Sequence, residues 1–389
     1  MHRIQGRYEE GRIAYFDNLK FILITLVVLG HAIDPFRNVF PVYARLYFFI
    51  YIFHMPLFMF VTGIFSRRAL GYDLAPGELP ERRTGIARAA SFIVLYLMLN
   101  FSIFIVERLG AGRDVVFNPL SVRNASWYFL ACGILTFVCA LTGGAGRRLG
   151  VRRKALVIAL VALAAVVIGY FDSFDDFLAL SRVICFAPFF LAGLYIGPER
   201  LAGVHRRTYA AGNGRIWLPC GKTMTIFAMS VLVAVGVTIF LMPEQWLVVR
   251  GILSARNPYY RFADLASYGP VMRLMWYAIA SALSFCVMVI VPARAMFYTR
   301  LGSNTISIYI WHLLLLRLLG TTASVPFMAH IVAGADMSVR PVMSLIPVGL
   351  SIATVFLFSL KPPFGVLAGK IMRTIGRPVK FQAEKLRNL

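Results

Sequence analysis

The amino-acid sequence predicts an all-α integral membrane protein with about ten transmembrane helices and both termini in the cytoplasm. Of its 389 residues, 59% are hydrophobic and only 15% are charged, whereas a soluble domain carries about 25% charged residues. The apolar residues form repeated runs of about 16–23 residues, long enough to cross a bilayer as helices. These runs do not alternate with a period of two, which favours helices over a barrel. A soluble enzyme, a disordered protein and a secreted disulfide scaffold are therefore excluded.

Ten apolar runs define the predicted helices. In chain order they are 19–33, 43–65, 85–106, 127–142, 155–170, 178–197, 223–242, 270–292, 303–320 and 340–360. The first run is interpreted as a retained helix, because no small-residue cleavage site follows it. The second contains Pro56, which is expected to kink it. Residues 1–18 are predicted to form a cytoplasmic segment, residues 19–360 one transmembrane domain, and residues 361–389 a basic cytoplasmic tail.

The charge distribution gives the predicted orientation. Forty Lys and Arg residues against 17 Asp and Glu residues give a net charge of +23, which in a soluble protein suggests a nucleic-acid partner. Here most of the basic residues lie in alternate loops and in the tail, on the side assigned to the cytoplasm. The opposite side includes Asp172, Asp175 and Asp176 without a basic neighbour. The membrane orientation therefore accounts for most of the charge, and no nucleic-acid partner is expected.

The first predicted helix carries the polar residues Asp17, Lys20 and His31. Ionisable side chains inside a membrane span are costly and mark function by default. Lys20 and His31 are eleven residues apart, so they project from the same face, about 16 Å apart along the axis. In the alternative interpretation, Lys20 extends to the inner interface and His31 caps the outer end of the helix.

Further candidate residues lie in later helices. His54 stands two residues before a proline, and the expected kink is typical of helices that line cavities; a packed histidine with one hydrogen bond is the alternative. Arg182 lies far enough inside its run to need a carboxylate, an anionic ligand or water, unless it marks the outer edge. Tyr309 and His312 are one turn apart and are candidates for a hydrogen-bonding pair. Trp127 begins a segment typical of an interfacial aromatic belt.

Neither a disulfide framework nor a metal site is expected. The five cysteines form no CxxC or CxxxC pair, and most lie in apolar runs, where they act as small hydrophobic residues. The histidines lack ligand spacing with cysteine or a second close carboxylate.

Five segments, in order along nearly the whole chain, resemble motifs of the membrane acyltransferase 3 family, especially its fucose 4-O-acetylase-like branch. They cover residues 15–31, 53–63, 126–130, 182–193 and 301–312. The first has the basic residue and histidine of the family signature, although the family often has Arg at the position of Lys20. The second ends in Thr62 and Gly63, where the family commonly has Ser before the glycine.

The resemblance implies transfer of an acyl group, usually acetyl, from cytoplasmic acyl-CoA to a sugar hydroxyl of an exported glycan or lipid-linked saccharide. His31 is then expected to be the general base, with acyl transfer through His31 itself as a variant. Lys20, grouped with Asp17 in the catalytic set, and Arg182 are candidates to bind the anionic CoA or the developing oxyanion. The expected substrate-binding residues are Arg182, His54, Tyr309, His312 and Trp127. No tightly bound cofactor is expected, acetyl-CoA or another acyl-CoA is the co-substrate, and a bacterial inner membrane is the expected location.

A polytopic secondary transporter or glycan exporter is the competing class. Ten helices, charges inside the membrane and proline-broken helices also occur in carriers. Against this class stand the absence of an internal repeat and the position of the acidic residues outside the spans. An inactive accessory subunit of a polysaccharide-assembly complex is a third alternative.

Overall fold

The computed structural model describes residues 14–73, 82–110, 114, 116–142, 145–171, 177–197, 221–253, 255, 258–321, 334 and 345–360. These residues are all-α, and their one β-type contact is an isolated bridge between Ser121 and Phe177. The prediction of an all-α protein is confirmed. The N-terminal residues 1–13, the acidic segment 172–176 and the predicted basic tail 361–389 lie outside the described residues.

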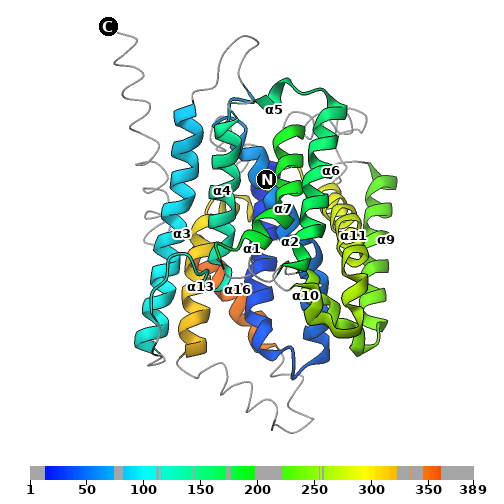
Figure 1. Cartoon of the computed structure of the whole chain (residues 1–389). Helices are drawn as coiled ribbons and strands as arrows, with labels where there is room; N and C mark the ends of the chain where they lie inside the picture. Colours follow the sequence, from blue (N-terminus) through cyan, green and yellow to red (C-terminus); the bar gives the residue numbers. More distant parts are fainter. Residues whose placement is uncertain are drawn as a thin grey trace. The chain divides into compact units, whose positions relative to one another are not determined.

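A helix lies at the place of every predicted run (Figure 1). The long helices are α1 (Ala14–Ile33), α2 (Pro41–Ser66), α3 (Arg82–Gly110), α4 (Trp127–Leu141), α6 (Val151–Val167), α7 (Leu180–Ile196), α9 (Lys222–Leu241), α11 (Gly269–Ile290), α13 (Thr305–Thr321) and α16 (Ile346–Ser359). The short ones are η2 (Asp34–Phe36), η3 (Asn124–Ser126), α5 (Ala145–Arg148), η4 (Ile168–Tyr170), η5 (Glu244–Val249), α10 (Arg250–Leu253), η6 (Tyr259–Tyr268) and α12 (Thr299–Gly302).

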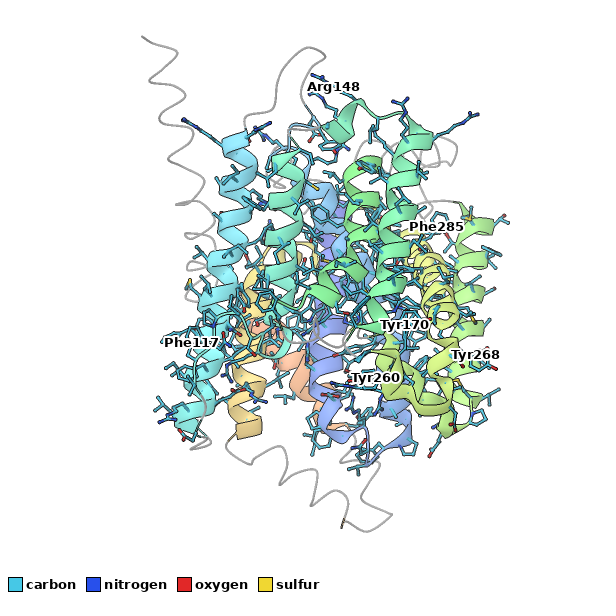
Figure 2. All side chains as sticks on the ribbon, in the orientation of Figure 1. Phe117, Arg148, Tyr170, Tyr260, Tyr268 and Phe285 are labelled. Atoms are coloured by element: carbon cyan, nitrogen blue, oxygen red, sulfur yellow. The ribbon has the colours of Figure 1, made fainter. Side chains whose placement is uncertain are left out.

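Several of these helices have the length and the surface of membrane spans. Among the described residues, five are long and apolar enough to cross a bilayer: Ala14–Phe36, Pro41–Ser66, Arg82–Gly110, Lys222–Leu241 and Asp264–Ile290. Large apolar side chains lie exposed on them, such as Phe285 on α11, which is 48% exposed (Figure 2). Such surfaces are matched by lipid rather than by water. The protein is therefore a multi-pass membrane protein, while the ten crossings and the cytoplasmic termini stay predictions.

The chain divides into two compact units, each assembled from separate stretches. The first unit is Met1–His54, Glu199–Leu247 and Ala278–Gly365, and the second is Met55–Pro198, Val248–Tyr277 and Val366–Leu389. Within the described part of the first unit, α1 packs against α12, α13 and α16. Within that of the second, α3 packs along α4, and α7 packs against α4 and α6 (Figure 1).

The first helix begins at Ala14, earlier than the predicted residue 19, because its first turns are buried and their polar groups are paired. The side chain of Asn18 is fully buried. Its Nδ2 donates to the carbonyl oxygens of Pro292 and Arg294, both at 2.8 Å. Its Oδ1 accepts from the Thr299 hydroxyl at 2.6 Å. Asn18 therefore attaches the start of α1 to the segment that leads into α12.

Replacing Asn18 by leucine is expected to destabilise the protein by about 3 kcal/mol, because two carbonyl groups and one hydroxyl group lose their buried partner. Thermal unfolding of the purified protein in lipid nanodiscs measures the change. The matched control is Ser102→Ala, since the Ser102 hydroxyl donates only to the Met98 carbonyl of its own helix at an exposed position. Equal unfolding temperatures for the two variants would show that the Asn18 contacts contribute nothing.

Candidate active site

An ion pair occupies the beginning of α1. Lys20 Nζ lies 2.5 Å from Asp17 Oδ1, and the two side chains are 23% and 7% exposed. The structure thus brings together two of the predicted catalytic residues. On the face that runs from Lys20 toward His31 lie Ile24 and Val27, which are buried and apolar. About 16 Å of helix therefore separates the ion pair from the histidine, without a continuous polar path.

His31 stands in the last turn of α1 and is partly exposed. Its ring centroid is 5.5 Å from that of His312 on α13, and the two planes are tilted by 40°. It is 6.5 Å from the ring centroid of Tyr51 on α2. The Tyr51 ring is in turn 4.6 Å from that of His54. The first unit therefore brings together three histidines from three helices, with Tyr51 beside His31 and His54 and with His312 beside His31.

The local backbone orients two of these histidines. His54 Nδ1 lies 2.7 Å from the carbonyl oxygen of Ile50, and His312 Nδ1 lies 2.8 Å from that of Ile308. A carbonyl oxygen only accepts hydrogen bonds, so each Nδ1 is the protonated donor. In a neutral ring this leaves Nε2 with the lone pair. The Nε2 of His312 is buried and has no hydrogen-bond partner among the described residues.

Aromatic rings form one wall of the histidine group. Tyr47 stacks on Tyr51 with a centroid separation of 3.7 Å, and the Arg37 guanidinium lies over the Tyr47 ring at 5.1 Å. A Cβ atom at Gly30 would lie 2.9 Å from Cε2 of Tyr51. The glycine before His31 therefore gives Tyr51 the space to approach α1.

Tyr309 belongs to the same group. Its ring centroid is 5.5 Å from that of His312, with planes at 78°. The structure thus brings together His31, His54, Tyr309 and His312. Asp34, three residues after His31, forms an ion pair with Arg37 at 2.8 Å.

The other two predicted residues meet in the second unit. The Arg182 guanidinium lies 5.4 Å from the centroid of the Trp127 ring, and Trp127 stacks on Phe186 at 5.0 Å. Both Arg182 and Trp127 are buried. Trp127 is therefore a packed residue beside a cation, a different environment from the interfacial belt that its segment suggested.

Two further residues of interest were not predicted from the sequence. Tyr51 contacts both His31 and His54, and its signal was its position three residues before His54, which places both on one face of a helix. Arg273 is fully buried in α11, near the start of the predicted span 270–292. The rule that selected Arg182, that a charge inside a span marks function, selects Arg273 equally.

The histidine group has the chemistry of a proton-transfer site. It offers one partly exposed imidazole and two imidazoles oriented by backbone carbonyl groups, beside the rings of Tyr51 and Tyr309. Among the residues that the structure describes, no group of three or more His, Cys, Asp or Glu side chains is placed to hold a metal ion.

Comparison with known proteins gives one match. The sequence profile of a family described as an acyltransferase domain matches residues 13–360. This match covers every described helix, including those of the histidine group. No curated protein and no solved structure matches the chain.

Proposed function

The chain belongs to the acyltransferase 3 family, and from this membership we propose that it is a membrane O-acetyltransferase of a bacterial inner membrane. In this proposal it moves the acyl group of cytoplasmic acetyl-CoA to a sugar hydroxyl of an exported or lipid-linked glycan. The resemblance of the five segments to the fucose 4-O-acetylase-like branch suggests the sugar acceptor. The observation that carries the proposal is the partly exposed His31 imidazole beside His312 and Tyr51.

The proposed reaction is direct acyl transfer. The sugar hydroxyl oxygen attacks the thioester carbonyl of acetyl-CoA, His31 takes the hydroxyl proton, the new C–O bond forms, the C–S bond breaks, and CoA leaves as the thiolate. A sugar hydroxyl is a poor nucleophile without such a base, and a positioned histidine contributes about 10²–10⁴-fold. The imidazolium then returns its proton to the thiolate or to water.

In this mechanism His312 is a positioning residue. Its Nδ1 donates to the Ile308 carbonyl, so its Nε2 keeps the lone pair. A ring-centroid separation of 5.5 Å is short enough for a hydrogen bond from protonated His31, directly or through one water. That hydrogen bond would stabilise the imidazolium that forms as the sugar hydroxyl attacks. His54, Tyr51 and Tyr309 complete the wall that receives the substrate.

Lys20 and Arg182 have separate proposed roles. Lys20 is about 16 Å along α1 from His31, too far to contact the developing oxyanion, so we assign the Lys20–Asp17 pair to the phosphate end of CoA. The phosphates of CoA lie far from its thioester. In this proposal Lys20, at one end of α1, therefore meets the phosphates, and His31, at the other end, meets the thioester. Arg182, held over Trp127, is assigned to an anionic group of a substrate.

Labelled acetyl-CoA distinguishes this proposal from the transporter alternative. Purified protein in nanodiscs is given the donor and a mixture of bacterial glycans, and we expect label on a glycan together with release of CoA. In sealed vesicles, a carrier would instead move glycan across the membrane without consuming acetyl-CoA. Folded protein that neither releases CoA nor transfers label from any of several acyl-CoA donors would overturn the proposal.

A further inference from the structure

The second unit holds a buried positive charge that is not part of the histidine group. Arg273 on α11 is fully buried, and a guanidinium stays charged in proteins. Its Nη1 contacts Cys185 Sγ, and the group lies 5.5 Å from the centroid of the Tyr259 ring. Its Nε and Nη2 have no hydrogen-bond partner among the described residues. A buried charge with two unsatisfied donors is costly.

The neighbouring groups do not supply the missing acceptors. The Tyr277 hydroxyl donates to the Cys185 carbonyl at 2.7 Å, and the Tyr259 hydroxyl donates to the Val166 carbonyl at 2.9 Å. The Ser181 hydroxyl donates to the Ala255 carbonyl at 2.7 Å. The oxygens of these hydroxyl groups could still accept, but none of them accepts a hydrogen bond from Nε or Nη2 of Arg273. A thiol is only a weak acceptor.

Three of the four described carboxylates of this unit form ion pairs with other arginines, and the fourth, Asp264, is exposed and forms none with Arg273. These pairs are Arg67 with Asp73, Arg108 with Asp114, and Arg123 with Glu107. The positive charge of Arg273 is therefore not balanced by an ion pair within the described part of the unit.

The two unpartnered atoms have a specific geometry. In a planar guanidinium, Nε–H and the adjacent Nη2–H point in the same direction and form one of the forks that bind two oxygens of a carboxylate or phosphate. In Arg273 the Nε and Nη2 atoms of this fork have no partner among the described residues, because Nη1 is the atom that contacts Cys185.

We propose that Arg273 binds an oxyanion, a phosphate or carboxylate group, in the second unit. The Nε and Nη2 atoms of Arg273 hold two of its oxygens. A lipid headgroup and a water-soluble anion share this chemistry, and nanodiscs of different lipid composition distinguish them. Arg273 has no part in the proposed acyl transfer, and it belongs to another unit than His31.

Thermal unfolding of the full chain tests the proposal. In nanodiscs of phosphatidylcholine, inorganic phosphate is expected to raise the unfolding temperature of the wild type with saturation, as a ligand of the native state does. Arg273→Gln is expected to remove the response. Arg273→Lys keeps the charge but lacks the fork, and is expected to weaken phosphate binding about tenfold or more. The matched control is Arg148→Gln, a change of an exposed arginine on α5 (Figure 2) that should leave the response intact.

A second arm identifies the source of the anion. If a lipid headgroup is the ligand, nanodiscs that contain phosphatidylglycerol stabilise the wild type without added phosphate, and Arg273→Lys reduces that effect. The proposal is overturned if neither phosphate nor phosphatidylglycerol stabilises the wild type, or if Arg273→Lys and the wild type respond equally. It is also overturned if a Cys185 thiolate balances the charge of Arg273. In that case Cys185→Ser would lower the unfolding temperature, and phosphate would leave the unfolding temperature of the wild type unchanged.

Discussion

His31→Gln is expected to reduce kcat/KM for acetyl transfer by about 10²–10⁴-fold, the contribution of a positioned general base. Glutamine resembles histidine in length and in hydrogen bonding, but it cannot take the proton of the sugar hydroxyl. The histidine is partly exposed at the end of α1, so the variant should fold normally. Transfer of labelled acetyl groups from acetyl-CoA by the protein in nanodiscs measures the effect.

Two comparisons make this result specific. The matched control is His205→Gln, the same change at a residue outside the described part of the chain to which no role is assigned. His312→Gln should give a smaller loss than His31→Gln, together with a changed pH profile, because it removes the acceptor proposed for the His31 imidazolium rather than the base itself. Full activity of His31→Gln, with an unchanged unfolding temperature, would refute the role proposed for His31.

The positions of the helices and of the histidine group were largely predictable from the sequence. Apolar runs of membrane-spanning length left little choice of secondary structure, and the rule that polar groups inside a span have a purpose selected His31, His54 and His312. Tyr51 was not selected, because it is one of 17 tyrosines in the chain, and its spacing from His54 alone does not place it beside His31. Its role follows only from the packing of α2 beside Gly30.

Hydrogen bonds between distant residues could not be predicted. Asn18 bonds to carbonyl groups of Pro292 and Arg294, more than 270 positions away. The protonation of Nδ1 in His312 follows from the side-chain torsion that turns this atom toward the Ile308 carbonyl. These features depend on how helices pack, and apolar periodicity does not encode them.

The structure also explains why two of the recognised segments contain glycine. A Cβ atom at Gly63 would lie 2.0 Å from the carbonyl oxygen of Phe190, and one at Gly193 would lie 1.9 Å from that of Phe60. The two glycines therefore allow the backbones of α2 and α7 to touch, as small residues do in membrane helix pairs. The Thr62 hydroxyl lies 2.7 Å from the Tyr128 hydroxyl; serine also supplies a hydroxyl, so this departure from the family pattern is conservative.

Gly193→Ala is accordingly expected to destabilise the protein by about 3 kcal/mol, at the upper end of the cost of overpacking. The added methyl group would meet a backbone carbonyl, which cannot turn away as a flexible side chain does. The helices must separate, and the paired contact at Gly63 is then weakened as well. Thermal unfolding in nanodiscs measures the loss.

Gly349→Ala is the matched control, because it makes the same change within α16 at a position where a Cβ atom meets nothing within 4 Å. Alanine favours helix over glycine by roughly 0.5–1 kcal/mol, so this variant is expected to be as stable as the wild type or slightly more stable. The two variants share the gain in helix propensity and differ in the contact with the facing backbone. A difference of about 3–4 kcal/mol between them would therefore measure the close approach of α2 and α7. Equal stability would show that the helices can separate without cost, and that the two glycines are not needed for packing.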